Sequence, residues 1–202
     1  ESIEKPMEYY TENLESLLSI IQVANEKNAK NFIFSSSATV YGDTKESCVT
    51  EETPLGKPLN PYGHTKILGE KILQSGKQEF KTILLRYFNP VGAHDSAKIG
   101  ELPNGVPNNL VPYITQTAAG KREKLTVFGN DYNTKDGTCI RDFIHVVDLA
   151  EAHVAALNYS ENMNEAVEMF NVGTGKGNTV LELIETFEKV NDLKLNYSIG
   201  ER

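Results

Sequence analysis

The chain alternates amphipathic helical stretches with short apolar runs, and this alternation restricts its fold more than any other feature of the sequence. Apolar residues over 6–28 fall at helical spacing, at Tyr10, Leu14, Leu17, Leu18 and Ile21. The run over 31–36 has the length of a buried strand, and a second helix, to about residue 75, precedes a strand over 82–86. Helix, strand, helix, strand in this order indicates a parallel sheet with crossover helices, and so an α/β fold.

The rest of the chain continues with shorter elements and longer loops. The predicted segments are a loop over 37–60, a proline- and glycine-rich loop over 88–109, a helix over 110–119, a short strand over 125–128, a polar loop over 129–138, a helix over 145–158 and a strand over 168–172. A loop longer than about 15 residues in a compact domain is usually functional or disordered. We expect a function for the segment over 88–109.

A glycine-rich stretch over 173–177 lies between a predicted strand and a predicted helix, where a phosphate-binding loop would lie. Its sequence, GTGKG, fits neither the dinucleotide-binding spacing nor the P-loop spacing. The residues from Thr179 to Glu182 have the pattern of a capping box. We therefore predict a plain turn followed by a capped helix.

Composition narrows the class of partner. With 202 residues and 39% hydrophobic content, the chain can bury a core, and we expect one domain or slightly more. Its 20 Lys and Arg against 28 Asp and Glu give a net charge of -8. No basic run stands out, which argues against a nucleic-acid or anionic-membrane partner. An anionic small molecule remains a candidate ligand, held by a local arginine.

The cysteine and hydropathy patterns predict a soluble cytoplasmic protein without a metal. Cys48 and Cys139 stand far apart with no metal-type spacing, so we expect reduced thiols. No apolar run approaches the roughly 18 residues of a membrane-spanning helix, and we expect neither a membrane segment nor a leader. The chain begins at Glu1 rather than Met, which suggests a piece of a longer protein.

Tyr62 and Lys66 stand four residues apart, just inside a predicted helix that Asn60 can cap and whose first turn suits Pro61. They should therefore share one helix face. A neighbouring cation favours the phenolate, so we expect Lys66 to lower the pKa of Tyr62; a decrease from about 10 to about 7 takes roughly 4 kcal/mol. By itself such a pair is usually an exposed Tyr and Lys on a solvated helix, and only context indicates chemistry.

That context begins at the end of the first predicted strand, where Ser35 to Gly42 reads SSSATVYG. In open α/β sheets, ligands bind outside the carboxyl ends of the strands, so we expect Ser37 to meet Tyr62. Serines at a strand end are, taken singly, ordinary turn formers. The combination of Ser37 with the Tyr/Lys pair is what indicates a site.

Several motifs, in order along nearly the whole chain, carry a resemblance to a known family. They are SSSATVYG over 35–42, NPYGHTK over 60–66, LRYFNPVGAH over 85–94, PNNL over 107–110 and RDFIH over 141–145. Through them the sequence resembles the extended short-chain dehydrogenase/reductases, and most closely the UDP-glucose (UDP-galactose) 4-epimerases. The resemblance implies a Rossmann-type doubly wound parallel sheet with a smaller α/β portion that binds a nucleotide sugar.

The resemblance also implies an activity. The expected reaction is the reversible C4 epimerisation of UDP-glucose and UDP-galactose, in galactose metabolism, through a 4-keto intermediate and with tightly bound NAD. In this interpretation Tyr62 is the general base and acid at the sugar 4-hydroxyl, and Ser37 hydrogen-bonds that hydroxyl and relays its proton. Lys66 would lower the pKa of Tyr62 and hold the nicotinamide ribose.

Further site residues follow from the resemblance by position. The cofactor-binding set is Asn13, Ser37, Tyr62, Lys66, Tyr87 and Phe88. The substrate-binding set is Ser37, Tyr62, Asn89, Asn108, Asn109, Leu110, Phe128 and Arg141. Phe128 would be the uracil wall and Arg141 a clamp on the diphosphate, for which a planar charged fork is suited. Two plain alternatives stay open: the two asparagines before Leu110 could only cap a helix, and Arg141 could pair with Asp142.

Some family features are absent. Phe143 stands where the family often has Tyr, and Leu102 where an acidic residue usually precedes the proline. The glycine-rich dinucleotide loop and the acid for the adenine ribose would precede Glu1. We therefore expect the chain to be the later half of an NAD-binding domain with a truncated substrate portion, inactive when alone.

The expected domain organisation has four parts. Residues 1–87 would be the later half of the Rossmann domain, 88–142 the main substrate-binding portion, 143–167 the returning helix of the Rossmann domain, and 168–202 the remainder of the substrate-binding portion. A homodimer is a further expectation.

Other functions remain open at this point. One is a related nucleotide-sugar dehydratase or decarboxylase; those relatives place acidic residues just after the serine or threonine, where this chain has Ala38 and Thr39. Another is a non-catalytic nucleotide-sugar-binding homologue, which the presence of Ser37, Tyr62 and Lys66 disfavours. The acceptance of N-acetylated UDP-sugars and the presence of a following mutarotase domain are also open.

Overall fold

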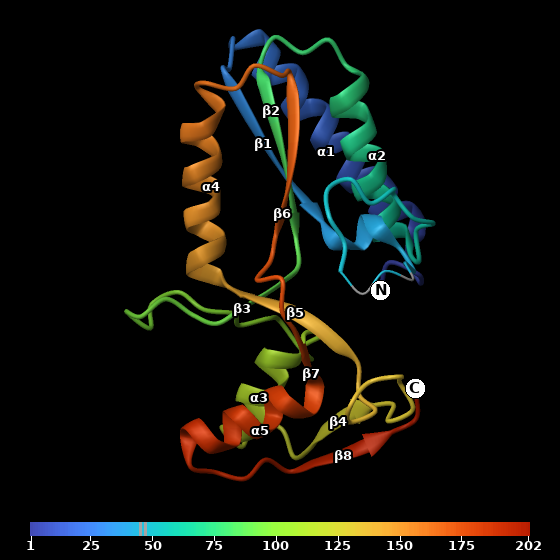
Figure 1. The fold of residues 1–202 in the computed structure, drawn as a ribbon, viewed down its shortest axis with the longest axis vertical. Coiled ribbons are helices and arrows are strands. Elements are labelled where there is room, and N and C mark those ends of the chain that lie inside the picture. Colours follow the sequence, from blue (N-terminus) through green and yellow to red (C-terminus); the bar gives the residue numbers. More distant parts are fainter. Residues whose placement is uncertain (45, 47) are drawn as a thin grey trace. The chain divides into compact units, whose positions relative to one another are not determined.

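The computed structural model describes residues 1–44, 46 and 48–202, so positions 45 and 47 of the predicted loop over 37–60 lie outside the described residues. The chain divides into two compact units (Figure 1). Unit 1 comprises Glu1–Phe88 and Leu149–Val172, and unit 2 comprises Asn89–Asp148 and Gly173–Arg202.

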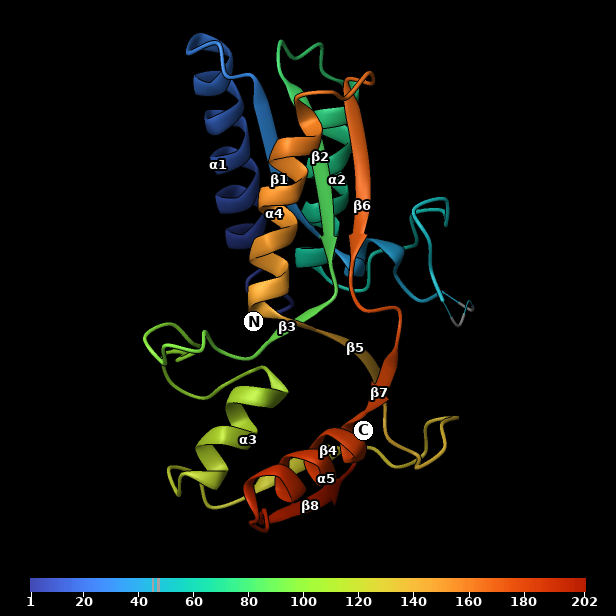
Figure 2. The same cartoon turned by 60° about the vertical axis from the view of Figure 1, so that its left-hand side comes forward.

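Unit 1 is a parallel sheet with helices on both faces. Its elements are α1 (Pro6–Glu26), β1 (Asn31–Ser37), the short 3-10 helix η1 (Ala38–Tyr41), α2 (Pro61–Ser75), β2 (Lys81–Tyr87), most of α4 (Val146–Ser160) and β6 (Val167–Val172). The strand order is β1-β2-β6, and both pairings are parallel. Figures 1 and 2 show α1 and α2 on one face of this sheet and α4 on the other. The predicted doubly wound arrangement is confirmed.

The core of unit 1 lies between the sheet and the helices α1 and α2. It contains Leu17 and Ile21 of α1, Leu73 of α2, Leu84 of β2, and Phe80. The helical spacing predicted over 6–28 is therefore correct for the buried stripe, although Leu18 remains 51% exposed.

Glycine permits the close approach of α2 to β1. A Cβ atom at Gly69 would lie 2.6 Å from the ring of Phe34, closer than side-chain atoms pack. Asn60 caps α2 by accepting a 2.8 Å hydrogen bond from the backbone N–H of Gly63, and Pro61 occupies the first turn, as predicted. These local features fix where α2 begins, and so where Tyr62 lies along it.

Unit 2 is built from shorter elements around its own core. They are β3 (Asn89–Val91), α3 (Leu110–Ala118), β4 (Leu125–Phe128), β5 (Ile140–His145), β7 (Gly177–Thr179), α5 (Val180–Asn191) and β8 (Tyr197–Gly200). One sheet has the order β3-β5-β7 and a second pairs β4 with β8. The core side chains are Ile114, Leu125, Val127, Ile184 and Leu195.

The unit boundaries differ from the expected ones at three places. Phe88, expected at the start of the substrate-binding portion, belongs to unit 1. Residues 168–172, expected in the substrate-binding portion, belong to β6, whose backbone pairs with β2 in the sheet of unit 1. Residues 143–148, expected in the returning helix, belong to unit 2, because β5 runs to His145 and pairs with β3. Backbone pairing with distant strands sets the boundaries at 143–148 and 168–172. A local sequence pattern does not record such pairing.

None of the described helices is both long and apolar enough to cross a membrane. Within the described part of the chain, no cluster of three or more His, Cys, Asp or Glu side chains could hold a metal ion. Both cysteines carry free thiols.

Candidate active site

The predicted catalytic residues come together at one end of the sheet in unit 1. Ser37 is the last residue of β1, while Tyr62 and Lys66 lie in the first two turns of α2. β1, β2 and β6 end in register, with Ser37 opposite Tyr87 and Tyr87 opposite Val172. The three side chains therefore lie at the carboxyl end of a parallel sheet, where α/β proteins bind ligands.

Ser37 has a hydroxyl group that is oriented by the chain itself. Its oxygen accepts a 3.3 Å hydrogen bond from the backbone N–H of Thr39 and thereby caps η1. Because the oxygen serves as the acceptor in this contact, the O–H bond is left to donate. The Ser37 hydroxyl acts to lower the pKa of Tyr62 and so favours its phenolate form.

Burial is the largest influence on Tyr62, and it raises the pKa of the phenol above its ordinary value. Hydrogen bonding from Ser37 acts in the opposite direction, and the phenol of Tyr9 on α1 adds to the increase. The expectation that the Tyr62 pKa is lowered by Lys66 is wrong for this structure. The reason lies in where the lysine binds.

The ammonium group of Lys66 donates a 2.8 Å hydrogen bond to the main-chain carbonyl oxygen of Ser35. It lies 5.5 Å from the centroid of the Tyr62 ring and 5.2 Å from that of Phe34. Burial lowers the pKa of Lys66 from its ordinary value. One of the three ammonium donors is thus used by β1, which leaves two for a bound molecule.

Tyr87, expected at the cofactor, joins this cluster through its hydroxyl group. The hydroxyl donates a 2.7 Å hydrogen bond to Ser35 Oγ and lies 2.5 Å from His153 Nε2 on α4. The other ring nitrogen of His153 lies 2.8 Å from the carbonyl oxygen of Leu149. Burial raises the pKa of Tyr87, and the nearby Tyr62 phenol contributes in the same direction.

The two remaining residues of the expected cofactor set are also in unit 1. Phe88 follows β2, and its backbone N–H donates a 3.0 Å hydrogen bond to the carbonyl oxygen of Val172, which continues the sheet. Asn13 lies on α1 and is partly buried. Neither residue has a side-chain contact that assigns it a role.

The expected substrate residues other than Ser37 and Tyr62 lie in unit 2. Asn89 begins β3, Leu110 begins α3, Phe128 ends β4 and Arg141 lies in β5, while Asn108 and Asn109 directly precede α3. The ring of Phe128 is 67% exposed, which leaves its face free to stack. Arg141 is exposed, and its Nη1 donates a 2.7 Å hydrogen bond to the carbonyl oxygen of Ile140.

The structure argues against both plain alternatives for these residues. Asn109 occupies the N-cap position of α3 without a side-chain cap; its amide donates a 2.7 Å hydrogen bond to Glu101 instead. Asp142 accepts hydrogen bonds of 2.9 and 2.6 Å from the backbone N–H and hydroxyl of Thr174, and one of 2.8 Å from the N–H of Gly175. Its carboxylate is therefore bound to this loop and not to Arg141.

The same contacts explain the glycine-rich loop over 173–177. The backbone N–H groups of Thr174 and Gly175 donate to the chain's own Asp142 carboxylate, and that of Lys176 donates to the Thr174 hydroxyl, so these groups are not available to a phosphate. After it, Thr179 and Glu182 form the predicted capping box at the start of α5. The interpretation as a turn and a capped helix is confirmed.

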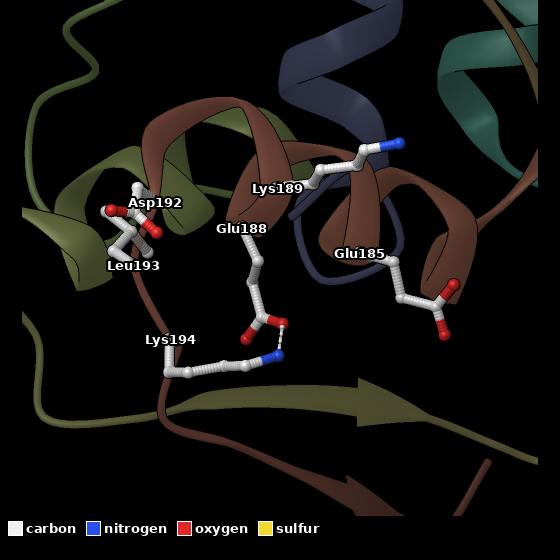
Figure 3. Close-up of a pocket in the computed structure, with 6 residues that line it drawn as sticks. All are labelled: Glu185, Glu188, Lys189, Asp192, Leu193 and Lys194. Carbon is white, nitrogen blue, oxygen red and sulfur yellow. Dashed lines mark hydrogen bonds and ion pairs between the residues drawn. The ribbon is translucent and has the colours of Figure 1, made fainter.

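Figure 3 shows a surface depression at the carboxyl end of α5, lined by Glu185, Glu188, Lys189, Asp192, Leu193 and Lys194. Glu188 and Lys194 form a 2.7 Å ion pair within it. The lining comes entirely from unit 2 and includes no predicted site residue. Charges of both signs line it, so it does not select one class of ligand.

Sequence reasoning missed Ser35 and His153, which contact Tyr87, and also the pair of Glu70 and Arg86, which binds Ser36 next to Ser37. The contact between Tyr87 and His153 spans 66 positions, and that between Tyr87 and Ser35 spans 52. The only signal for Ser35 was its place in the serine run at the strand end.

Comparison with known proteins gives a consistent result. The family model described as "NAD dependent epimerase/dehydratase family" matches residues 1–173. A UDP-glucose 4-epimerase of Pasteurella multocida is 50% identical over 100% of this chain and 60% of its own length. UDP-glucose 4-epimerase 2 of Arabidopsis thaliana is 52% identical over 96% of this chain and 56% of its own.

Solved structures show the same likeness. The crystal structure of UDP-glucose 4-epimerase from Bifidobacterium longum in complex with NAD+ and UDP has a TM-score of 0.93 at 47% identity, over 100% of this chain and 60% of that one. The enzyme from Stenotrophomonas maltophila, with bound NAD and formylated UDP-arabinopyranose, has a TM-score of 0.94 at 42% identity, again over 100% and 60%. The chain thus spans about 60% of the length of these relatives.

Proposed function

We propose that this chain, which belongs to the NAD dependent epimerase/dehydratase family, acts within a full-length UDP-glucose 4-epimerase. The proposed reaction is the reversible C4 epimerisation of UDP-glucose and UDP-galactose, an isomerisation of carbohydrate (galactose) metabolism. One observation carries the proposal: Ser37, Tyr62 and Lys66 meet at the carboxyl end of the unit 1 sheet. The similarity to named 4-epimerases over the whole chain supports the choice of reaction.

The proposed proton chemistry uses Tyr62 and Ser37. Tyr62 removes the proton of the sugar 4-hydroxyl while hydride leaves C4, and it returns the proton when hydride comes back to the opposite face. The Ser37 hydroxyl, held through its contact with Thr39, stabilises the phenolate and hydrogen-bonds the same sugar hydroxyl. The net reaction has no redox change, because the hydride that leaves C4 is returned to C4.

The residues of unit 1 fit a nicotinamide cofactor. Lys66 is fixed to the Ser35 carbonyl and retains two N–H donors for ribose hydroxyls. Tyr87 and the Phe88 backbone, both in the proposed cofactor-binding set, lie at the end of the same sheet. NAD, when bound, supplies the hydride acceptor and donor, while the chain supplies orientation and proton transfer.

In unit 2, Arg141 and Phe128 are the proposed anchors for UDP. The guanidinium of Arg141 is exposed and free of Asp142, so it can form the paired hydrogen bonds that a diphosphate accepts. The exposed ring of Phe128 can stack against uracil. Asn89, Asn108, Asn109 and Leu110 complete the proposed substrate set.

The dehydratase or decarboxylase alternative is not favoured. Those relatives typically place acidic residues just after the strand-end serine or threonine, and Ala38 and Thr39 provide none. The backbone N–H of Thr39 donates to the Ser37 side chain, and η1 begins directly after Ser37. The non-catalytic alternative predicts binding of a nucleotide sugar without turnover.

The proposal is tested by giving purified full-length protein UDP-galactose, without added NAD, and identifying the products. We expect UDP-glucose, and the same final mixture when the reaction starts from UDP-glucose. A 4-keto-6-deoxy product would identify a dehydratase. Binding of UDP-sugars without turnover, in protein that releases no NAD on denaturation, would identify a binding protein.

A cytoplasmic location and a homodimer remain predictions from the sequence. The free thiols of Cys48 and Cys139 are compatible with a reducing compartment. Size-exclusion chromatography with light scattering on the full-length protein would test the dimer.

A further inference from the structure

A buried polar network joins α2 to the end of β1 next to the catalytic residues. The Glu70 carboxylate accepts a 2.5 Å hydrogen bond from Ser36 Oγ and hydrogen bonds of 2.9 and 2.7 Å from Nε and Nη2 of Arg86. Glu70 is 0% exposed, Ser36 1% and Arg86 2%. The carboxylate is thus bound on both oxygens and shielded from water.

The network continues beyond the ion pair. Nη1 of Arg86 donates a 2.9 Å hydrogen bond to the hydroxyl of Tyr41, which donates a 2.6 Å hydrogen bond to Oδ1 of Asn171. These residues come from β1, η1, α2, β2 and β6. One connected set of contacts therefore ties the helix that carries Tyr62 to the strand end that carries Ser37.

Stability alone does not account for a buried ion pair. Replacement of such a pair by apolar residues of similar volume is often neutral or stabilising, because two charges must be taken out of water. A two-pronged Arg–carboxylate contact does, however, fix a geometry, since both hydrogen bonds must be satisfied together. Here it fixes the depth and rotation of α2 against the sheet.

The spacing along α2 links this geometry to catalysis. Tyr62, Lys66 and Glu70 follow one another at intervals of four residues, so they lie on one face of the helix. Ser36, which Glu70 holds, directly precedes Ser37. A slip of α2 by one residue would move Tyr62 by about 1.5 Å, and a displacement of about 1 Å can cost about a hundredfold in rate.

We propose that Glu70 and Arg86 are positioning residues: their buried ion pair holds α2 against the end of β1 so that Tyr62 and Ser37 reach the same sugar hydroxyl. This proposal rests on the proposed epimerase function. Neither residue touches substrate or cofactor in this account. They act through the placement of the residues that do.

The test compares full-length variants by turnover number, by KM for UDP-galactose and by thermal midpoint. The double variant Glu70→Leu/Arg86→Met removes both charges and keeps apolar bulk in the core. Leu73→Ala is the control, because Leu73 is 0% exposed on the same helix and lies outside the network. Glu70→Gln is the conservative variant, which keeps an acceptor and a side chain of the same length.

We expect the double variant to unfold cooperatively, with kcat reduced by about tenfold to a hundredfold and KM unchanged. Leu73→Ala should lower the thermal midpoint while kcat stays at the wild-type value. Glu70→Gln should retain more of kcat than the double variant does. This pattern separates positioning from stability, because loss of stability alone leaves the kcat of the folded fraction unaffected.

Wild-type kcat in a folded double variant would overturn the proposal and assign the pair to structure only. If the double variant does not fold, Glu70→Gln is measured instead, below its thermal midpoint. A reduced kcat at unchanged KM supports the positioning role. An unchanged kcat overturns it. A wild-type protein without turnover would contradict the proposed function, and the positioning role would fall with it.

Discussion

The ammonium of Lys66 binds the main-chain carbonyl oxygen of Ser35 at 2.8 Å, two residues before Ser37. This contact anchors the first turns of α2 to β1 and leaves the Tyr62 ring centroid 5.5 Å from the charge. Burial raises the pKa of Tyr62, and the Ser37 hydroxyl, rather than Lys66, is the group that opposes this increase. The role proposed for Lys66 is to orient a bound ribose.

The first prediction concerns the pH dependence of Ser37→Ala. Its hydroxyl favours the phenolate of Tyr62, so its removal raises the pKa of a phenol that burial already raises. The rising limb of kcat/KM against pH should therefore move to higher pH. Ser75→Ala, at the exposed end of α2, is the control and should leave the profile in place. An unmoved limb in Ser37→Ala would exclude Ser37 as the group that tunes Tyr62.

The second prediction concerns Arg141→Ala and the binding of UDP. Loss of one partner of a buried charged hydrogen bond commonly costs about 2–5 kcal/mol, so UDP affinity should fall more than tenfold. Isothermal calorimetry on the full-length protein measures it. Arg122→Ala is the matched control, because this guanidinium is bound to Gln116 and to the Gly105 carbonyl. Equal affinity in Arg141→Ala and wild type would assign Arg141 to structure.

The third prediction concerns acid stability in unit 2. A hydrogen bond from Lys194, helped by the N–H of Leu195, lowers the pKa of Glu188 below its ordinary value. A carboxylate with a lowered folded-state pKa stabilises the fold above its unfolded-state pKa, and this stabilisation is lost as pH falls through the folded-state pKa. The thermal midpoint should therefore fall less steeply below about pH 5 in Glu188→Gln than in wild type.

The control for this experiment is Glu185→Gln, on the same helix. Figure 3 shows the Glu185 side chain pointing away from Lys194. The thermal midpoint of Glu185→Gln should fall with decreasing pH as steeply as that of the wild type. If the thermal midpoints of Glu188→Gln and wild type fell equally steeply at acid pH, the role assigned to the Glu188–Lys194 pair would be contradicted.

The fourth prediction is that residues 1–202, expressed alone, retain no NAD. Dinucleotides in such folds are held chiefly at the first βα turn, where glycines let the pyrophosphate approach a helix N-terminus. The 202 residues contain no such motif, and in the described structure β1 pairs with β2 alone. Denatured segment should release no NAD, whereas the full-length protein should release it. Stoichiometric NAD from the segment would show that the cofactor site is built differently.

The fold of unit 1 could be predicted because its signals are local. Helical spacing over 6–28, the Asn60 cap and apolar runs of strand length each act within a few residues. In unit 2, the strand predicted over 125–128 is confirmed as β4. The strands β3, β5, β7 and β8 could not be predicted, because they are only a few residues long and are defined by partners far away in sequence. Asn89 pairs with Phe143, and Ile140 pairs with Thr179.

The candidate site divides in the same way. Ser37, Tyr62 and Lys66 could be found because each lies at a recognisable strand end or helix start. Ser35, His153 and the pair of Glu70 and Arg86 could not, because their contacts join different elements across 16 to 66 positions. Which charged residue in α2 is buried, and against what, is decided by tertiary packing.

Tyr62 is proposed to carry the proton of the sugar 4-hydroxyl, and turnover of UDP-galactose by full-length Tyr62→Phe tests this role most directly. The variant lacks the proton carrier and retains every proposed phosphate contact, so turnover should fall by about 10²–10⁴ while UDP affinity on the same preparation stays at the wild-type value. Tyr159→Phe, whose hydroxyl binds Glu168, should keep full turnover. Wild-type turnover in Tyr62→Phe would contradict the account.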